Sequence, residues 1–191
     1  LVCPILDANG WWVGSYGRDI TGQSEVSQLY LAGAHRAVWN AQAATVYPDE
    51  LICAESIFDA LAIWMHGGKK NVTAAYGARG FTPHHSKLLK KSGTKKLVLA
   101  FDADETGQER ARELAIDLTE KLKLATHRIK WPEQSEPDRQ IKDANDYFLY
   151  HGEADFKGSA ESFASLLTAA PRIGFKKSDC SKLNLLEQTE E

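Results

Sequence analysis

The sequence predicts an α/β fold, a parallel sheet flanked by helices and preceded by a small β-rich segment. Two observations carry this prediction. From residue 49 onward, short apolar runs alternate with amphipathic helical patterns, which is the rhythm of repeated strand–helix units. Before residue 48, apolar residues alternate instead with turn-forming residues, as in antiparallel strands. With 191 residues, 43% of them apolar, the chain is long enough to bury a core of its own.

The first segment contains a predicted β-hairpin over residues 4–18. Its turn falls at Asn9-Gly10, a dipeptide that accepts the positive φ angles of tight hairpin turns. Trp11-Trp12 follows the turn, and strand alternation places at least one of these rings in the core. A second short strand is expected over residues 28–32.

Four apolar runs are the predicted strands of the parallel sheet, since strands covered on both faces are apolar throughout. A helical pattern follows each of the first three runs, and more helical turns follow the fourth. Thr82-Pro83, a capping residue followed by proline, starts one of these helices. The predicted strands are 51–54, 72–76, 97–101 and 126–131, and the predicted helices are 56–66, 82–91, 109–123 and 159–169, with a short helix or turn at 143–150.

The chain divides into three predicted parts. Residues 1–47 form the β-rich segment, residues 48–152 the α/β domain, and residues 153–191 a C-terminal helix with a polar tail. The stretch 132–140 is expected to be a loop, and the tail from residue 174 to be disordered or the start of a further module. The chain begins Leu-Val-Cys-Pro without Met, as a piece of a longer protein would.

Composition limits the setting in which the protein is expected to work. No apolar run approaches the roughly 20 residues that span a bilayer, so no membrane partner is expected. The cysteines, Cys3, Cys53 and Cys180, lie far apart, which favours a reducing, cytoplasmic compartment. The net charge of −3 argues neither for nor against a nucleic-acid partner, because acidic and basic patches cancel in the sum.

Acidic side chains follow three of the predicted strands. Asp102 and Asp104 come directly after the third strand, Glu55 follows the first, and Asp143 lies beyond the fourth. Because neighbouring parallel strands lie about 4.8 Å apart, acids at their carboxyl ends can share one or two Mg²⁺ ions. Two such ions form the clamp of phosphoryl-transfer enzymes. The alternative for each acid is that it caps the helix after it.

Further residues rank behind these four. Asp59, one turn into a helix, is expected to interact with the helix dipole or to support the ligands rather than to bind metal. Asn145 is a further oxygen donor or only a helix cap, and Asp146 is a candidate of the same rank. Arg79 lies in a glycine-flanked loop at a strand end, from which its guanidinium can reach a phosphate.

Four stretches, 51–61, 76–82, 101–107 and 142–146, carry a resemblance to a known family. They are similar, in this order, to the first motif, the glycine-containing loop, the Asp-x-Asp motif and the third acidic motif of the TOPRIM domain, in the version found in bacterial and phage DNA primases. Any single motif is weak, but their order and spacing over residues 49–150 are specific.

The first segment resembles, more loosely, the part that precedes this domain in bacterial primases. Pro4–Gly10, Gly17-Arg18 and Tyr30-Leu31 match the order of motifs there. The resemblance implies that Arg18 lies on the side that binds nucleic acid or nucleotide, and Gly77 belongs to the matching loop.

The resemblance also implies a chemistry. The fold would be the Rossmann-like TOPRIM sheet, and Glu55, Asp102, Asp104 and Asp143 would form a divalent-metal and nucleotide site that takes Mg²⁺ or Mn²⁺. Glu55, Asp102 and Asp104 would be catalytic, with Glu55 as a ligand or as the general base. The implied activity is that of a DNA primase, the Mg-dependent synthesis of short RNA primers from ribonucleoside triphosphates on a single-stranded DNA template during replication. A replicative helicase is a further partner that the resemblance allows.

Two departures from the family pattern leave alternatives open. Ser56 stands where the family has Gly after the first-motif Glu, and Gln28-Leu29 stands where it has a Lys before Tyr-Leu. The alternatives are another TOPRIM activity, such as nuclease or topoisomerase-type strand cleavage, and a non-catalytic module that docks nucleic acid. A phosphoacceptor-like domain is weaker, because Lys130-Trp131 is a poor match to the Lys that such a domain needs.

Overall fold

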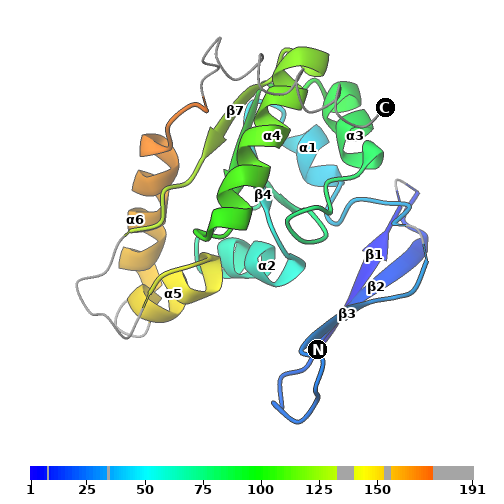
Figure 1. Ribbon diagram of the computed structural model, residues 1–191, viewed down its shortest axis with the longest axis vertical. Coiled ribbons are helices and arrows are strands. Elements are labelled where there is room, and N and C mark those ends of the chain that lie inside the picture. The colour runs from blue at the N-terminus through cyan, green and yellow to red at the C-terminus, as the bar shows by residue number, and fades with distance from the viewer. Residues whose placement is uncertain (8, 34, 133–139, 153–155, 174–191) are drawn as a thin grey trace, which may run out of the picture.

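The computed structural model shows two sheets joined by a short helical segment (Figure 1), and it describes all residues except 8, 34, 133–139, 153–155 and 174–191. Most of the loop expected at 132–140 and the polar tail from residue 174 lie outside the described residues. The first sheet is antiparallel, with the strands β1 (Val2–Leu6), β2 (Trp12–Arg18) and β3 (Gln28–Tyr30) in that order. The predicted β-rich segment is therefore confirmed.

The small sheet buries only one of its faces. Cys3, Ile5 and Tyr16 point into the core, whereas Val2, Leu6 and Leu29 are exposed. The prediction that Trp11 or Trp12 lies in the core is wrong, since the two rings are 71% and 65% exposed. Trp12 pairs with Leu6 on the outer face, where its Nε1 donates to Ser15 Oγ at 3.0 Å.

The second sheet has four parallel strands in the order β5-β4-β6-β7, which confirms the predicted α/β architecture. Strand β4 occupies the predicted residues, and the other strands and helices begin or end within a few residues of the expected positions. The short helix α1 was not predicted. The elements are α1 (Gln42–Val46), β4 (Leu51–Ala54), α2 (Ile57–Met65), β5 (Val72–Ala74), α3 (Pro83–Ser92), β6 (Lys96–Ala100), α4 (Glu105–Leu122), β7 (Ala125–Arg128), α5 (Ala144–Gly152) and α6 (Phe156–Ala169).

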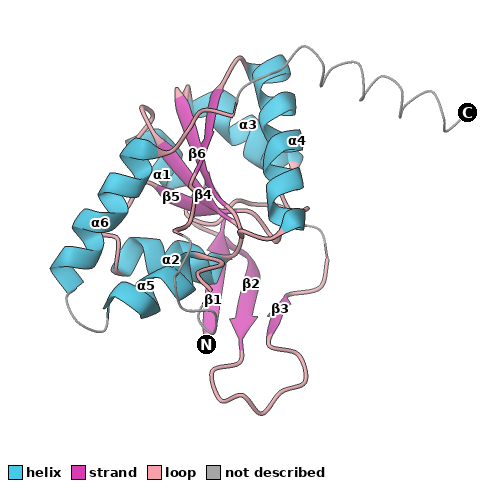
Figure 2. Ribbon diagram, turned by 60° about the vertical axis from the view of Figure 1, so that its left-hand side comes forward, coloured by secondary structure: helices cyan, strands magenta, loops and turns pink. Residues whose placement is uncertain are grey.

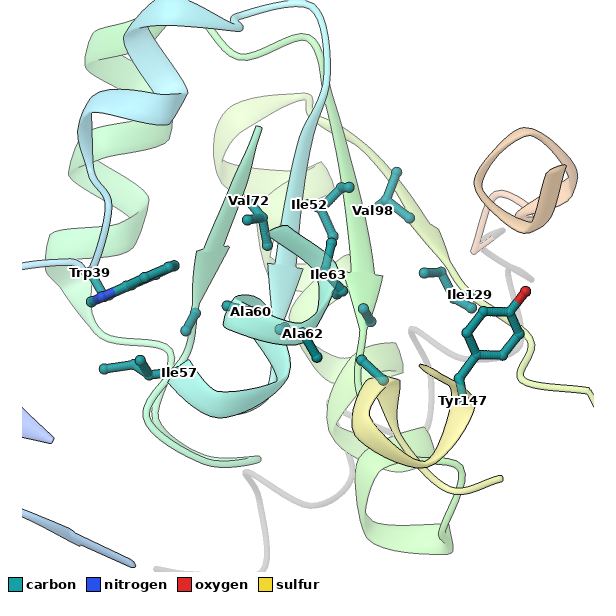
Figure 3. Close-up of a cluster of buried hydrophobic side chains, with 14 of the residues drawn as sticks. Trp39, Ile52, Ile57, Ala60, Ala62, Ile63, Val72, Val98, Ile129 and Tyr147 are labelled. Atoms are coloured by element: carbon teal, nitrogen blue, oxygen red, sulfur yellow. The ribbon is translucent and has the colours of Figure 1, made fainter. Parts of the chain in front are cut away.

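Helices cover both faces of the parallel sheet, because side chains on each strand alternate between two apolar clusters. Ile52 and Val98 pack with α2, α5 and α6 on one face (Figure 3), whereas Leu51 and Leu99 pack with α1, α3 and α4 on the other. Figure 2 shows the sheet with α2, α5 and α6 on one side and α3 and α4 on the other. Both faces are closed, so the carboxyl edge of the sheet is where polar side chains can gather.

Candidate functional site

The three acidic stretches meet at the carboxyl edge of the parallel sheet, as the strand order requires. Glu55 follows β4 and Asp102 follows the neighbouring β6, and the backbone N–H of Asp102 donates to Glu55 Oε2 at 3.3 Å. The N–H of Ala103 donates to the carbonyl of Lys142 at 2.7 Å, which holds the stretch containing Asp143 against the Asp-x-Asp turn. These bonds link the first stretch to the second, and the second to the third.

The third stretch is also linked to the first through side chains. Asn145 Nδ2 donates to Asp59 Oδ1 at 2.6 Å, although the two residues lie on different helices, α5 and α2. Asp59 is only 5% exposed. The structure therefore places Asp59 and Asn145 inside the cluster, where the hydrogen bond between them joins the two helices.

Two of the acids also cap helices. Asp104 Oδ1 accepts from the N–H of Gly107 at 2.7 Å and starts α4 four residues before the predicted position. Asp143 Oδ1 accepts from the N–H of Asp146 at 2.8 Å, just ahead of α5. A carboxylate has two oxygens, so a cap on one leaves the other for a ligand, and the capping and metal-binding alternatives are compatible.

Glycine is required at Gly107 for a steric reason. A Cβ there would lie 2.5 Å from the backbone oxygen of Asp102, closer than real side chains come. The first turn of α4 can therefore lie against the Asp-x-Asp turn only without a side chain at this position.

Ser56 replaces the family's glycine without strain. Its φ of −117° is extended backbone, so no left-handed conformation is needed. Its Oγ accepts from the N–H of Asp59 at 3.1 Å and donates to Asp59 Oδ2 at 2.5 Å, which caps α2.

Burial raises the pKa values of four carboxylates in the cluster. Burial, followed by the charges of Glu55, Asp59, Asp143 and Asp104, raises the pKa of Asp102 to about 7. Burial and then Asp59 raise the pKa of Asp143 to about 6, and burial is also the main reason that the pKa values of Glu55 and Asp59 are raised. Within the described part of the chain none of these acids forms an ion pair with Lys or Arg. No ion pair therefore offsets the negative charge of these acids among the described residues.

The donor set suits a hard divalent cation. All candidate ligands are carboxylate or amide oxygens, which Mg²⁺ and Mn²⁺ prefer. Among the described residues, however, no three His, Cys, Asp or Glu side chains are already grouped as a metal site. Side-chain rotation would be needed to close the acids around an ion.

The sequence also singled out three residues for binding, and the structure brings two of them to the first stretch. The Arg18 guanidinium lies 5.1 Å from the ring centroid of Phe58 on α2. Gly77, with a φ of +94°, donates its N–H to the carbonyl of Glu55 at 3.0 Å. Arg79 instead lines a cavity of about 570 Å³ facing α4, and no described contact joins it to the acids.

One residue beside the cluster was missed by the sequence analysis. Arg128, at the end of the edge strand β7, donates from Nη2 to the carbonyl of Asp102 at 3.3 Å. The signal in the sequence that could have identified Arg128 was a cation at the end of the strand next to the Asp-x-Asp motif.

A larger cavity of about 610 Å³, lined by Trp39 and Trp64, lies elsewhere and contains none of the acids.

No helix among the residues that the structure describes has the length and apolar content needed to cross a membrane.

Comparison with known proteins identifies a family for the part of the chain that contains the acidic stretches. A model of the Toprim-like family matches residues 52–148, about half of the chain. Comparison with curated proteins finds no match.

Several solved structures share the fold. The chain resembles the zinc-binding and RNA polymerase domains of the Aquifex aeolicus primase (22% identity, TM-score 0.65, 90% of this chain and 40% of that one). It also resembles a DnaG primase catalytic domain bound to single-stranded DNA (20%, 0.69, 90% and 52%) and the primase fragment of the bacteriophage T7 primase-helicase (19%, 0.58, 83% and 61%). The chain thus spans about half the length of these structures, and at such identities the likeness establishes the fold alone.

Proposed function

Because the chain belongs to the Toprim-like family, we propose that it is the catalytic part of a DNA primase. It would join ribonucleoside triphosphates into short RNA primers on a single-stranded DNA template, with Mg²⁺ or Mn²⁺ as cofactor. The likeness to solved primase domains, one of them bound to single-stranded DNA, supports this choice among Toprim activities.

The observation that carries the proposal is the meeting of Glu55, Asp102 and Asp143 at one edge of the sheet. Backbone and side-chain hydrogen bonds hold their three stretches together. Burial, and then the charges of neighbouring acids, raise the pKa values of Asp102 and Asp143. A cluster that serves only to cap helices would not need to bring like charges together, since each cap could stand alone.

In the mechanism, Asp102, Asp104 and Asp143 would hold the divalent cations. Bound there, the cations would supply positive charge at the 3′-hydroxyl and at the phosphates of the incoming nucleotide. Glu55 is either a fourth ligand or the general base that takes the hydroxyl proton, and its raised pKa suits a proton acceptor. Asp59 and Asn145 would keep α2 and α5 in register, so that the ligands stay in place.

The remaining residues would bind the substrates. Arg18, held over Phe58 beside the first stretch, would contact the phosphates of the template or of the nucleotide. Gly77, in the loop against Glu55, would let a nucleotide approach the backbone closely. Arg79 would bind a phosphate further from the acids, in the cavity between its loop and α4.

The test is primer synthesis on single-stranded DNA with labelled ribonucleotides and Mg²⁺ or Mn²⁺. Loss of metal ligands removes several kcal/mol of stabilisation, so the variant Asp102→Asn/Asp104→Asn should lose about a thousandfold in rate. Asp49→Asn, a neutralised acid at the opposite end of the sheet, is the matched control and should retain activity. Equal synthesis by the wild type and the double variant would refute the proposal.

One observation favours a second candidate, a docking module that retains the fold without catalysis. The acids are not already grouped as a metal site within the described residues. Calorimetry with Mn²⁺, with and without nucleotide, separates the two functions. A catalytic site should bind the ion at least when nucleotide is present, whereas a docking module should bind DNA with no dependence on divalent ions.

A further inference from the structure

A small basic pocket lies next to the acidic cluster, at the outer edge of the parallel sheet. Its cavity has a volume of about 160 Å³. Four cationic residues line it, and we call them the basic pocket: Arg112, Arg128, Lys130 and Arg172.

Three segments of the chain build this pocket. Arg112 comes from α4, and Arg128 from the edge strand β7, which packs against α4. Arg172 comes from the segment after α6, which runs along β7 as an added antiparallel partner. There the N–H of Ile173 donates to the carbonyl of Thr126 at 2.9 Å, and Arg172 forms a bridge with His127. The pairing fixes this segment at the rim of the pocket.

None of the four cations of the basic pocket forms an ion pair within the described residues. The ion pairs there involve Lys95, Lys96, Arg110 and Lys121, and none of the four pocket cations. This contrasts with the rest of the surface of α4, where Arg110 and Lys121 are both paired.

Arg128, one of the four, is also incompletely bonded. Its Nε is buried and has no hydrogen-bond partner, while Nη2 donates to the carbonyl of Asp102. Arg112 lines the same cavity as Arg128. A guanidinium that is half-buried beside another cation costs free energy unless an anion joins it.

We propose that the basic pocket binds a phosphate group. Several guanidinium groups and one ammonium group around one cavity match the charge and the planar hydrogen-bond geometry of phosphate. The cavity is too small for a whole nucleotide, because sites for ligands of that size measure about 300–1,000 Å³. Only the phosphate would enter, while the attached sugar and base stay outside.

The position of the pocket beside the acids suggests that a bound phosphate orients a substrate. Arg128 contacts the backbone of Asp102, so a phosphate bound by Arg128 lies beside the acidic cluster and orients whatever molecule carries it. This role rests on the proposed function, whereas phosphate binding itself does not. The phosphate would come from the backbone of a nucleic-acid strand or from the tail of a nucleoside triphosphate.

The experiment compares two double variants of the full chain that each lose two positive charges. Arg112→Gln/Arg172→Gln removes exposed members of the pocket, and Lys87→Gln/Lys90→Gln, on exposed positions of α3, is the control. Binding of a labelled single-stranded oligonucleotide is measured by fluorescence anisotropy over a series of salt concentrations. In a separate arm, binding of a labelled nucleoside triphosphate is measured in the same way.

If a strand phosphate occupies the pocket, the pocket variant should bind the oligonucleotide about tenfold more weakly than the wild type. The slope of log affinity against log salt should fall by about 0.7 for each phosphate that the variant no longer neutralises. If the phosphate belongs to the nucleotide, the same weakening should appear only in the nucleotide arm. Either result supports the site, and unchanged binding in both arms, or an equal weakening in the control, overturns it.

Two further measurements distinguish loss of phosphate binding from unfolding of the variants and from failure of the proposed function. The Tm of both double variants should lie close to that of the wild type. The single variant Arg128→Gln should show the same loss of binding as the pocket variant. Primer synthesis is measured alongside. A wild type that makes no primer while the pocket variant still loses phosphate binding would refute the proposed function and leave the phosphate site standing.

Discussion

Charged side chains are arranged differently at the two ends of the parallel sheet. At the amino end, Lys95 Nζ lies 2.7 Å from Asp49 Oδ1 and Lys96 Nζ lies 2.8 Å from Glu50 Oε2, so each cation has its acid. At the carboxyl end, acids gather beside acids, and the pKa of Asp102 is raised to about 7. The same strands β4 and β6 carry both arrangements.

The difference shows which charges are balanced within the protein and which would be balanced only by a bound cation. Paired surface charges are close to neutral for stability, so the amino end could be built from almost any polar residues. Crowded carboxylates are unfavourable until a cation neutralises them. We therefore expect changes at the carboxyl end to alter ion binding and activity, and changes at the amino end to alter neither.

The largest expected effect on stability is that of divalent ions. Mn²⁺ at about 100 times its dissociation constant should stabilise the wild type by about 2.7 kcal/mol, a rise in Tm of roughly 5–10 °C. Asp102→Asn should remove this response, because a ligand and its charge are lost. Without divalent ions the same variant should be at least as stable as the wild type at pH 8, since repulsion in the cluster is relieved. Thermal unfolding with Mn²⁺ and with chelator measures both effects.

Asp49→Asn is the control from the other end of the sheet. Its acid is 82% exposed and paired with Lys95, so the response to Mn²⁺ should match that of the wild type. A wild type whose Tm ignores divalent ions, or an Asp102→Asn variant that keeps the full response, would contradict the comparison between the two ends.

The carboxyl end also contains a buried histidine, His85, which is kept neutral. Nδ1 accepts from the N–H of Thr82 at 3.0 Å, so Nε2 carries the proton and donates to the carbonyl of Ala74 at 2.9 Å. Burial, and then the nearby His84 and His35, lower its pKa to about 4, with the hydrogen bond to the Ala74 carbonyl acting in the opposite direction. The aromatic rings of Tyr76 and Phe81 complete its surroundings.

This lowered pKa predicts a loss of stability in acid. The unfolded chain takes up the proton near pH 6.5, whereas the folded chain resists it until about pH 4. The stability contributed by neutral His85 is therefore present above pH 6.5 and is lost as pH falls, by about 2 kcal/mol between pH 7 and pH 5.

Urea unfolding of His85→Gln and of the exposed neighbour His84→Gln over this pH range measures the effect. The difference in unfolding free energy between His85→Gln and the wild type should shrink as pH falls, while His84→Gln should follow the wild type. Parallel pH curves for His85→Gln and the wild type would contradict the prediction.

The sequence was enough to predict most of the fold, because apolar runs and helical periodicity record which faces are buried. Strand β4 was predicted residue by residue, and the succession of strands and helices along the chain from β4 to α6 was also predicted. The start of α4 was missed by four residues, because Asp104 caps the helix in addition to ending the Asp-x-Asp motif. Trp12 was misplaced because alternation shows that a strand has two faces without showing which one is covered.

The candidate site was predictable only as far as it lies in short motifs. Glu55, Asp102, Asp104 and Asp143 stand at strand ends or in a motif of their own, and parallel pairing brings those ends together. Arg128 and the bond between Asn145 and Asp59 depend on which helices and edge strands pack against each other. Contacts between residues 86 positions apart leave no local pattern to read.

The smallest expected effect is at the amino end. Lys96→Gln removes a partly exposed ion pair, with side chains 29% and 33% exposed, and should cost only about 0.5 kcal/mol in urea unfolding. The rate of primer synthesis and the rise in Tm with Mn²⁺ should equal those of the wild type, because Lys96 lies at the opposite end of β6 from Asp102. A Lys96→Gln variant with a weakened Mn²⁺ response would show that charge at one end of β6 acts on the other. The ends would then be one electrostatic unit, and the pairing at the amino end would serve the acids as well as the fold.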